Sequence, residues 1–154
     1  MYKKIPFFIL ITFFLSFLNT SASESGITIV SNKLNVEMNQ RISIFTGDVH
    51  AYNESLKVWS DEMTIKLKKE KDEIKEILAV GNVKIIRLVE GSEIYGDTAN
   101  YSLEEEVIII TGNVVVMEDG NQVAGDELVV DLKSSSSIMV GSDSNRVKAL
   151  IVNN

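Results

Sequence analysis

Apolar and polar residues alternate with a period of two along most of the chain beyond residue 26. One five-residue phrase carries this alternation three times, at residues 45–49 (FTGDV), 79–83 (AVGNV) and 110–114 (ITGNV). The first, third and fifth positions of each copy hold an apolar residue or glycine, and the positions between them are mostly polar. Because successive side chains of a strand point to opposite faces, the phrase predicts strands with one buried and one solvated face.

A second phrase alternates with the first one. It occupies residues 60–65 (SDEMTI), 96–101 (GDTANY) and 125–130 (GDELVV), with a weaker copy at 31–36 (SNKLNV), so the copies are spaced 29, 36 and 29 residues apart. The residues between the phrases are rich in β-branched types, and the one proline of the chain is Pro6. The two phrases predict a repeated strand–turn–strand unit, and therefore an all-β antiparallel fold without an amphipathic helix.

The alternation also predicts a bend in the strands. Val58, Ile94 and Val123 each lie five residues before an expected interior residue, so a regular strand would place them on the outer face. An extra bulged residue at the Ser/Gly-Asp corner would turn them inward, and Gly96 and Gly125 would suit such a bend. The predicted apolar interior consists of Phe45, Val49, Ala51, Met63, Ile65, Leu67, Val83, Ile85, Ala99, Tyr101, Leu103, Val114, Val116, Leu128, Val130 and Leu132.

The first residues read as a secretory signal. Lys3 and Lys4 precede an almost wholly apolar run at residues 5–18, and small residues follow at 20–23. This run is shorter than the roughly 20 residues that a bilayer-spanning helix needs. We therefore expect a cleaved signal peptide at residues 1–22 and a single domain at residues 23–154, with a retained membrane anchor as the alternative.

Charge and cysteine content exclude several classes of function. Residues 1–22 contain two lysines and no acidic residue, so their removal changes the net charge from −7 to −9. A domain this acidic repels nucleic acid. The chain has no cysteine, which excludes disulfides, thiol nucleophiles and thiolate metal sites.

The remaining candidate chemistry gives no catalytic set, metal site or cofactor site. His50 is the one histidine, and we expect it to be solvated on the polar face beside Asp48. The corner carboxylates Asp61, Asp97 and Asp126 recur once per repeat, which is typical of aspartates that cap their own backbone at a turn and not of a unique catalytic pair. Trp59 beside the first corner is expected to pack in the core or at its rim, with a binding surface as the alternative.

Four features occur in order along the chain: the phrase FTGDVHA at residues 45–51, the two later Gly-Asn-Val phrases, the Ser/Gly-Asp phrases and the terminal RVKALI at residues 146–151. In this order they resemble the OstA-like family of periplasmic lipopolysaccharide-transport proteins. The resemblance runs from about residue 27 to residue 151. It implies a V-shaped antiparallel β-jellyroll that holds acyl chains of lipopolysaccharide in its interior. It also implies a head-to-tail bridge between inner- and outer-membrane partners, LptC-like and LptD-like proteins, with no chemistry performed on the lipid.

Edges and alternatives complete the prediction. Strands at both ends of an open sheet keep unpaired backbone groups, which can accept a further strand. The predicted edge residues are Ile27, Ile29, Leu34 and Val36 at one end and Val147, Ala149 and Ile151 at the other. A membrane-anchored member of the same transport system and a structural or adhesive β-repeat module with a filled core remain as alternatives.

Overall fold

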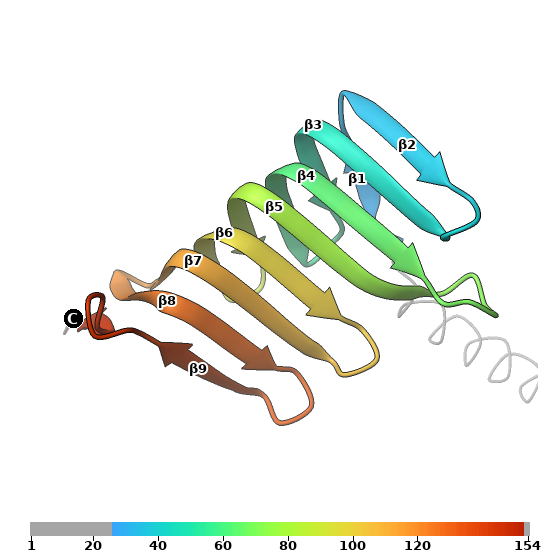
Figure 1. Cartoon of the computed structure of the whole chain (residues 1–154). Helices are drawn as coiled ribbons and strands as arrows, with labels where there is room; N and C mark the ends of the chain where they lie inside the picture. The colour runs from blue at the N-terminus through green and yellow to red at the C-terminus, as the bar shows by residue number, and fades with distance from the viewer. Residues whose placement is uncertain (1–25, 153–154) are drawn as a thin grey trace, which may run out of the picture.

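The computed structural model describes residues 26–152, so the predicted signal peptide lies outside the described residues. All ten strands of the described part join one antiparallel sheet, in the order β1-β3-β4-β5-β6-β7-β8-β10 with β2 beside β3 and β9 beside β8 (Figure 1). The strands are β1 (Thr28–Val30), β2 (Lys33–Glu37), β3 (Ile42–Tyr52), β4 (Leu56–Leu67), β5 (Ile74–Arg87), β6 (Ser92–Ser102), β7 (Val107–Glu118), β8 (Asn121–Asp131), β9 (Ser136–Val140) and β10 (Lys148–Leu150). The all-β prediction is confirmed, and residues 26–152 contain no helix that could cross a membrane.

The sheet is folded over itself into two arms. Figure 1 shows the six long strands β3–β8 curving together, so that each of them contributes to both arms. Arm one contains β1, β10 and residues 49–52, 56–60, 83–87, 92–96, 114–118 and 121–125 of the long strands. Arm two contains β2, β9 and residues 42–46, 62–67, 74–80, 98–102, 107–111 and 127–131. Buried side chains of the two arms pack together in one core cluster.

The two arms meet along a line that is here called the corner. It is built around three residue pairs, Gly47-Asp48, Gly81-Asn82 and Gly112-Asn113. Both residues of each pair adopt positive φ angles, as at Gly81 (83°) and Asn82 (47°). The strand register shifts at each of these pairs, where β3, β5 and β7 carry one more residue than the strand beside them. Glycine, aspartate and asparagine tolerate this left-handed conformation better than other residues, which explains why the phrase recurs.

The bend therefore differs from the sequence prediction in its location. In β4 the buried residues have even numbers up to Ser60 and odd numbers from Met63 onward, so the strand does bend between them. Val58 and Ile94 are buried, as this bend requires. However, the extra residue lies in the neighbouring strand, opposite the Ser/Gly-Asp phrase. Gly96 does not supply the bend. It makes room for the side chain of Ile110, because a Cβ atom at position 96 would lie 2.5 Å from Cγ2 of Ile110.

Candidate functional site

The interior along the corner is filled by aliphatic side chains. Met63, Ile110, Val49, Val83 and Val114 each expose less than 2% of their surface, and they come from both arms. A hollow along this line would leave their side chains accessible to water. The corner is thus a packed core, which holds the two arms together by burial of apolar surface.

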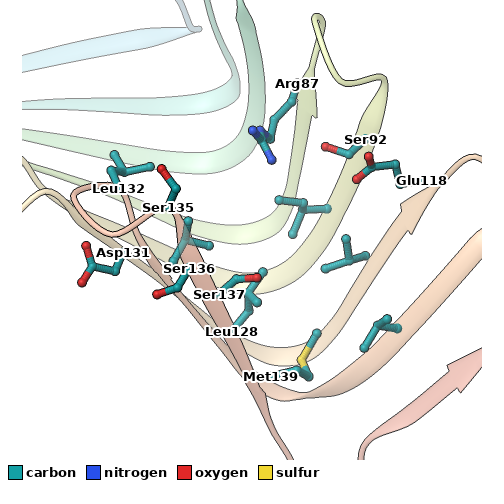
Figure 2. A pocket seen from close by; sticks show the side chains of 14 residues that line it. Arg87, Ser92, Glu118, Leu128, Asp131, Leu132, Ser135, Ser136, Ser137 and Met139 are labelled. Atoms are coloured by element: carbon teal, nitrogen blue, oxygen red, sulfur yellow. The ribbon is translucent and has the colours of Figure 1, made fainter.

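Away from the corner, toward the tips of the arms, the interior opens into a cavity of about 460 Å³. In Figure 2, Arg87, Ser92 and Glu118 lie on one side of this cavity, and Leu132, Asp131 and the serines at 135–137, in the turn after β8 and at the start of β9, lie on the other side. The lining residues are Arg87, Ser92, Ile94, Val116, Glu118, Val123, Leu128, Val130, Asp131, Leu132, Ser135, Ser136, Ser137 and Met139.

The cavity has an apolar floor and a polar rim. Its floor is aliphatic and includes Met139 of β9, whereas its rim carries charged groups and hydroxyls. At the rim, Arg87 pairs with the carboxylate of Glu90. Backbone N–H donation from Ser134 keeps the pKa of Asp131 below its ordinary value, with the side chain of Ser134 and Lys133 adding to the effect. A molecule with an apolar body and a polar head matches this arrangement.

Most of the predicted interior residues lie inside the fold, at different depths. Those that the structure buries are Val49, Ala51, Met63, Ile65, Val83, Ile85, Ala99, Val114 and Leu128. The half-buried ones are Phe45, which lies beside the corner on β3, and, nearer the tips of the arms, Leu67, Tyr101, Leu103, Val116 and Val130. Leu132 is 43% exposed because it lies in the turn after β8, where it lines the cavity. Only part of the predicted set therefore faces open space.

Sequence reasoning missed several members of the core and of the cavity wall. Ala79 and Ile110 are buried, as their first position in the repeated phrase predicts, although the predicted interior set left them out. Met139 was missed because β9 follows a serine-rich stretch that reads as a loop. Ser92 is buried at the wall, and its hydroxyl has no hydrogen-bond partner among residues 26–152. No periodic signal marks it.

The recurring aspartates stabilise the corner. The side-chain amide of Asn82 donates to Asp61 over 2.8 Å, and that of Asn113 donates to Asp97 over 3.1 Å. Asn145 donates to Asp126 in the same way. These carboxylates thus accept from amides of a neighbouring segment, not from their own backbone as predicted. Within residues 26–152, no three histidine, aspartate or glutamate side chains are grouped so that they could hold a metal ion.

The environment of His50 also differs from the prediction. Its side chain is on the outer face of arm one, as expected, but it is half-buried and stacked on Trp59, with ring centroids 4.6 Å apart and planes 8° from parallel. Trp59 accordingly belongs to the outer face and not to the core.

Within residues 26–152, the strand edges at both ends of the sheet are unpaired. Leu34 and Val36 on β2 are 53% and 52% exposed, whereas Ile27 and Ile29 pack against the core. At the other end Ala149 lies in β10, and Val147 and Ile151 flank this strand. The prediction omitted β9, whose Ile138 is 61% exposed and which forms the arm-two half of this edge.

An open β-jellyroll with an amphipathic cavity between its arms defines a class of binding protein for molecules that combine apolar and polar parts. The family model "LptA/(LptD N-terminal domain) LPS transport protein" matches residues 28–136, so the chain belongs to this LptA-like family, as its repeated phrases predicted. The structure also matches LptH, the LptA-homologous periplasmic component of the conserved lipopolysaccharide transport device from Pseudomonas aeruginosa, with a TM-score of 0.73 and 19% identity over 84% of this chain and 97% of that chain. This likeness confirms the predicted jellyroll fold. No curated protein sequence matches the chain.

Proposed function

We propose that this protein binds lipopolysaccharide in the periplasm and passes it from the inner toward the outer membrane, as one segment of a head-to-tail β-jellyroll bridge. Residues 1–22 would be the cleaved signal peptide and residues 23–154 the working domain. The observation that carries the proposal is the cavity between the arms, with its aliphatic floor and its rim of charged groups and hydroxyls. Membership of a lipopolysaccharide-transport family supports the same function.

Binding by apolar area alone suits a carrier. Each buried methylene contributes about 0.8 kcal/mol, so about ten methylenes of acyl chain contribute about 8 kcal/mol. Association costs at least about 4 kcal/mol of this gain, which leaves reversible binding. No covalent bond of the lipid has to be made or broken during transfer, so the proposed role is not enzymatic.

The strand directions favour assembly through the sheet edges. Each neighbouring pair of strands from β3 to β8 is antiparallel, β2 is antiparallel to β3, and β9 is antiparallel to β8. It follows that β9 of one copy and β2 of the next would also pair antiparallel, and so would β10 and β1. The exposed apolar residues Leu34, Val36 and Ile138 would be covered at such a joint. LptC-like and LptD-like partners would use these two edges at the ends of the bridge.

Photo-crosslinking at three consecutive residues of β7 tests lipid binding in the cavity. The crosslinking residue is placed at Val116, which lines the cavity, at Val115, which lies on the outer face, and at Val114, which is fully buried at the packed corner. In a host that makes lipopolysaccharide, we expect an adduct at position 116 and little at 115 or 114. Folded protein without an adduct at any position would refute the proposal and favour a structural module with a filled core.

A further inference from the structure

The outer face of arm one carries a row of aromatic and cationic side chains across four strands. Cross-strand pairing aligns His50 of β3 with Trp59 of β4, Trp59 with Lys84 of β5, and Lys84 with Tyr95 of β6. Nζ of Lys84 lies 5.8 Å from the Trp59 ring centroid and 5.3 Å from that of Tyr95, within the range of cation–π attraction. His50 stacks on Trp59 and fixes the orientation of the indole.

Beside this row lies a groove of about 460 Å³ on the outside of the sheet, separate from the cavity between the arms. Trp59, Tyr95 and Lys84 contribute aromatic and aliphatic surface to the groove, and the corner residues Asn82, Asp97 and Asn113 contribute amide and carboxylate groups. Aromatic faces and hydrogen-bonding groups therefore converge on one depression, and the His50 contact orders Trp59 before any ligand arrives.

The charged groups around the groove are already compensated. Lys84 pairs with Glu93 at 3.4 Å, and the hydroxyl of Tyr95 donates to the same carboxylate over 2.5 Å. Asp97 accepts from the amide of Asn113 over 3.1 Å. A charged ligand would have to displace one of these pairs. A neutral ligand rich in hydroxyl groups could instead use the remaining donors and acceptors of the carboxylates and amides.

We propose that this groove on the outer face of arm one is a binding site for a neutral saccharide. The C–H faces of the sugar rings would pack on Trp59 and Tyr95, and the sugar hydroxyls would bond to Asn82, Asp97 and Asn113. An acyl chain would cover the remaining donors and acceptors of these three side chains without bonding to them, and nucleic acid is repelled by the acidic chain. The site does not depend on lipid binding in the cavity, so either proposal can fail without the other.

Trp59 is the only tryptophan of the chain, so its fluorescence reports on this groove alone. The purified protein is titrated with two neutral, soluble saccharides: chitotriose, which represents cell-wall glycan, and maltotriose, which represents the neutral hexoses of a lipopolysaccharide. We expect a saturable change in Trp59 emission and a matching heat of binding with at least one of them. The saccharide that binds identifies the source of the natural ligand.

Two variants locate the binding. Tyr95→Ala removes one aromatic wall and should weaken binding roughly tenfold, the size of a lost stacking contact. Met117→Ala, on the same outer face but not in the groove, should bind like the original protein. Circular dichroism confirms that both variants are folded. The proposal would be overturned if neither saccharide bound, whether or not dodecanoate changed the Trp59 emission. It would also be overturned if Tyr95→Ala bound with the affinity of the original protein.

Discussion

Gly112 at the corner of β7 offers a test of why the Gly-Asn phrase recurs. Its φ angle is 81°, and a Cβ atom there would lie 2.7 Å from both Cβ and Cγ of Asp97 and would also contact Oδ2 of this residue. Cβ of Asp97 is fixed to the backbone, so rotating the side chain cannot remove the clash. Gly112→Ala should therefore displace the corner of β6 and break the bond between Asp97 and Asn113.

The expected destabilisation has two parts that a second glycine separates. An alanine with left-handed backbone costs about 1–2 kcal/mol, and the lost hydrogen bond adds about 1 kcal/mol. Gly120 has the same φ of 81°, but no atom of the described part of the chain lies within 4 Å of the Cβ position of an alanine there. Gly120→Ala should thus lose only the backbone part, whereas Gly112→Ala should lose about 2–3 kcal/mol in total.

Urea unfolding followed by circular dichroism measures both losses, and the difference between the two variants is the contribution of the contact with Asp97. Equal losses would show that this contact does not constrain the corner, and the explanation of the repeat would be refuted. As a further check, Asp97→Ala in the Gly112→Ala background should recover part of the loss, because it removes the displaced carboxylate.

Three other perturbations test the packing, the electrostatics and the edges. Ile110→Ala at the packed corner should cost about 2–5 kcal/mol of unfolding free energy, whereas the neighbouring outward Ile109, 39% exposed, should cost well under half as much in the same urea assay. The pKa of Glu76 is lowered from 4.5, chiefly by its hydrogen bond from Lys66, so its stabilisation is present above pH 4.5 and is lost as the pH falls through the lowered value. Glu76→Gln should reduce stability near neutrality by up to about 1 kcal/mol and remove this part of the acid dependence; an unchanged pH profile would contradict the assignment. Ile138→Lys on the β9 edge should reduce self-association in light scattering, while Ile109→Lys on the outer face should not; equal association of both variants would exclude this edge as a joint.

The sequence was sufficient for the fold because its information is local and repeated. Alternation assigned the inward residues of each phrase, such as Met63 and Val114, and the structure buries both. The place of the extra corner residue was not predictable in this way. It depends on which of two neighbouring strands takes left-handed angles, and the sequence suggested Gly96 where the structure uses Gly112.

The candidate site was less predictable than the fold. Inward orientation is a property of a single strand, but open space depends on how two arms diverge. Val114 and Val116 have the same periodicity, yet the first is fully buried and the second lines the cavity. The polar part of the lining includes Arg87 at the rim and Ser92 in the wall, which lie on opposite sides of one turn and carry no repeated signal.

The six strands that cross the corner also limit how such a protein can change in length. Six is an even number, and only an even number leaves the two ends of the sheet in opposite directions, so that copies can join antiparallel. Loss or gain of a single crossing strand would make every joint parallel. Under the proposed head-to-tail assembly, the domain can therefore lengthen or shorten only by whole hairpins, in steps of about 10 Å for two strands.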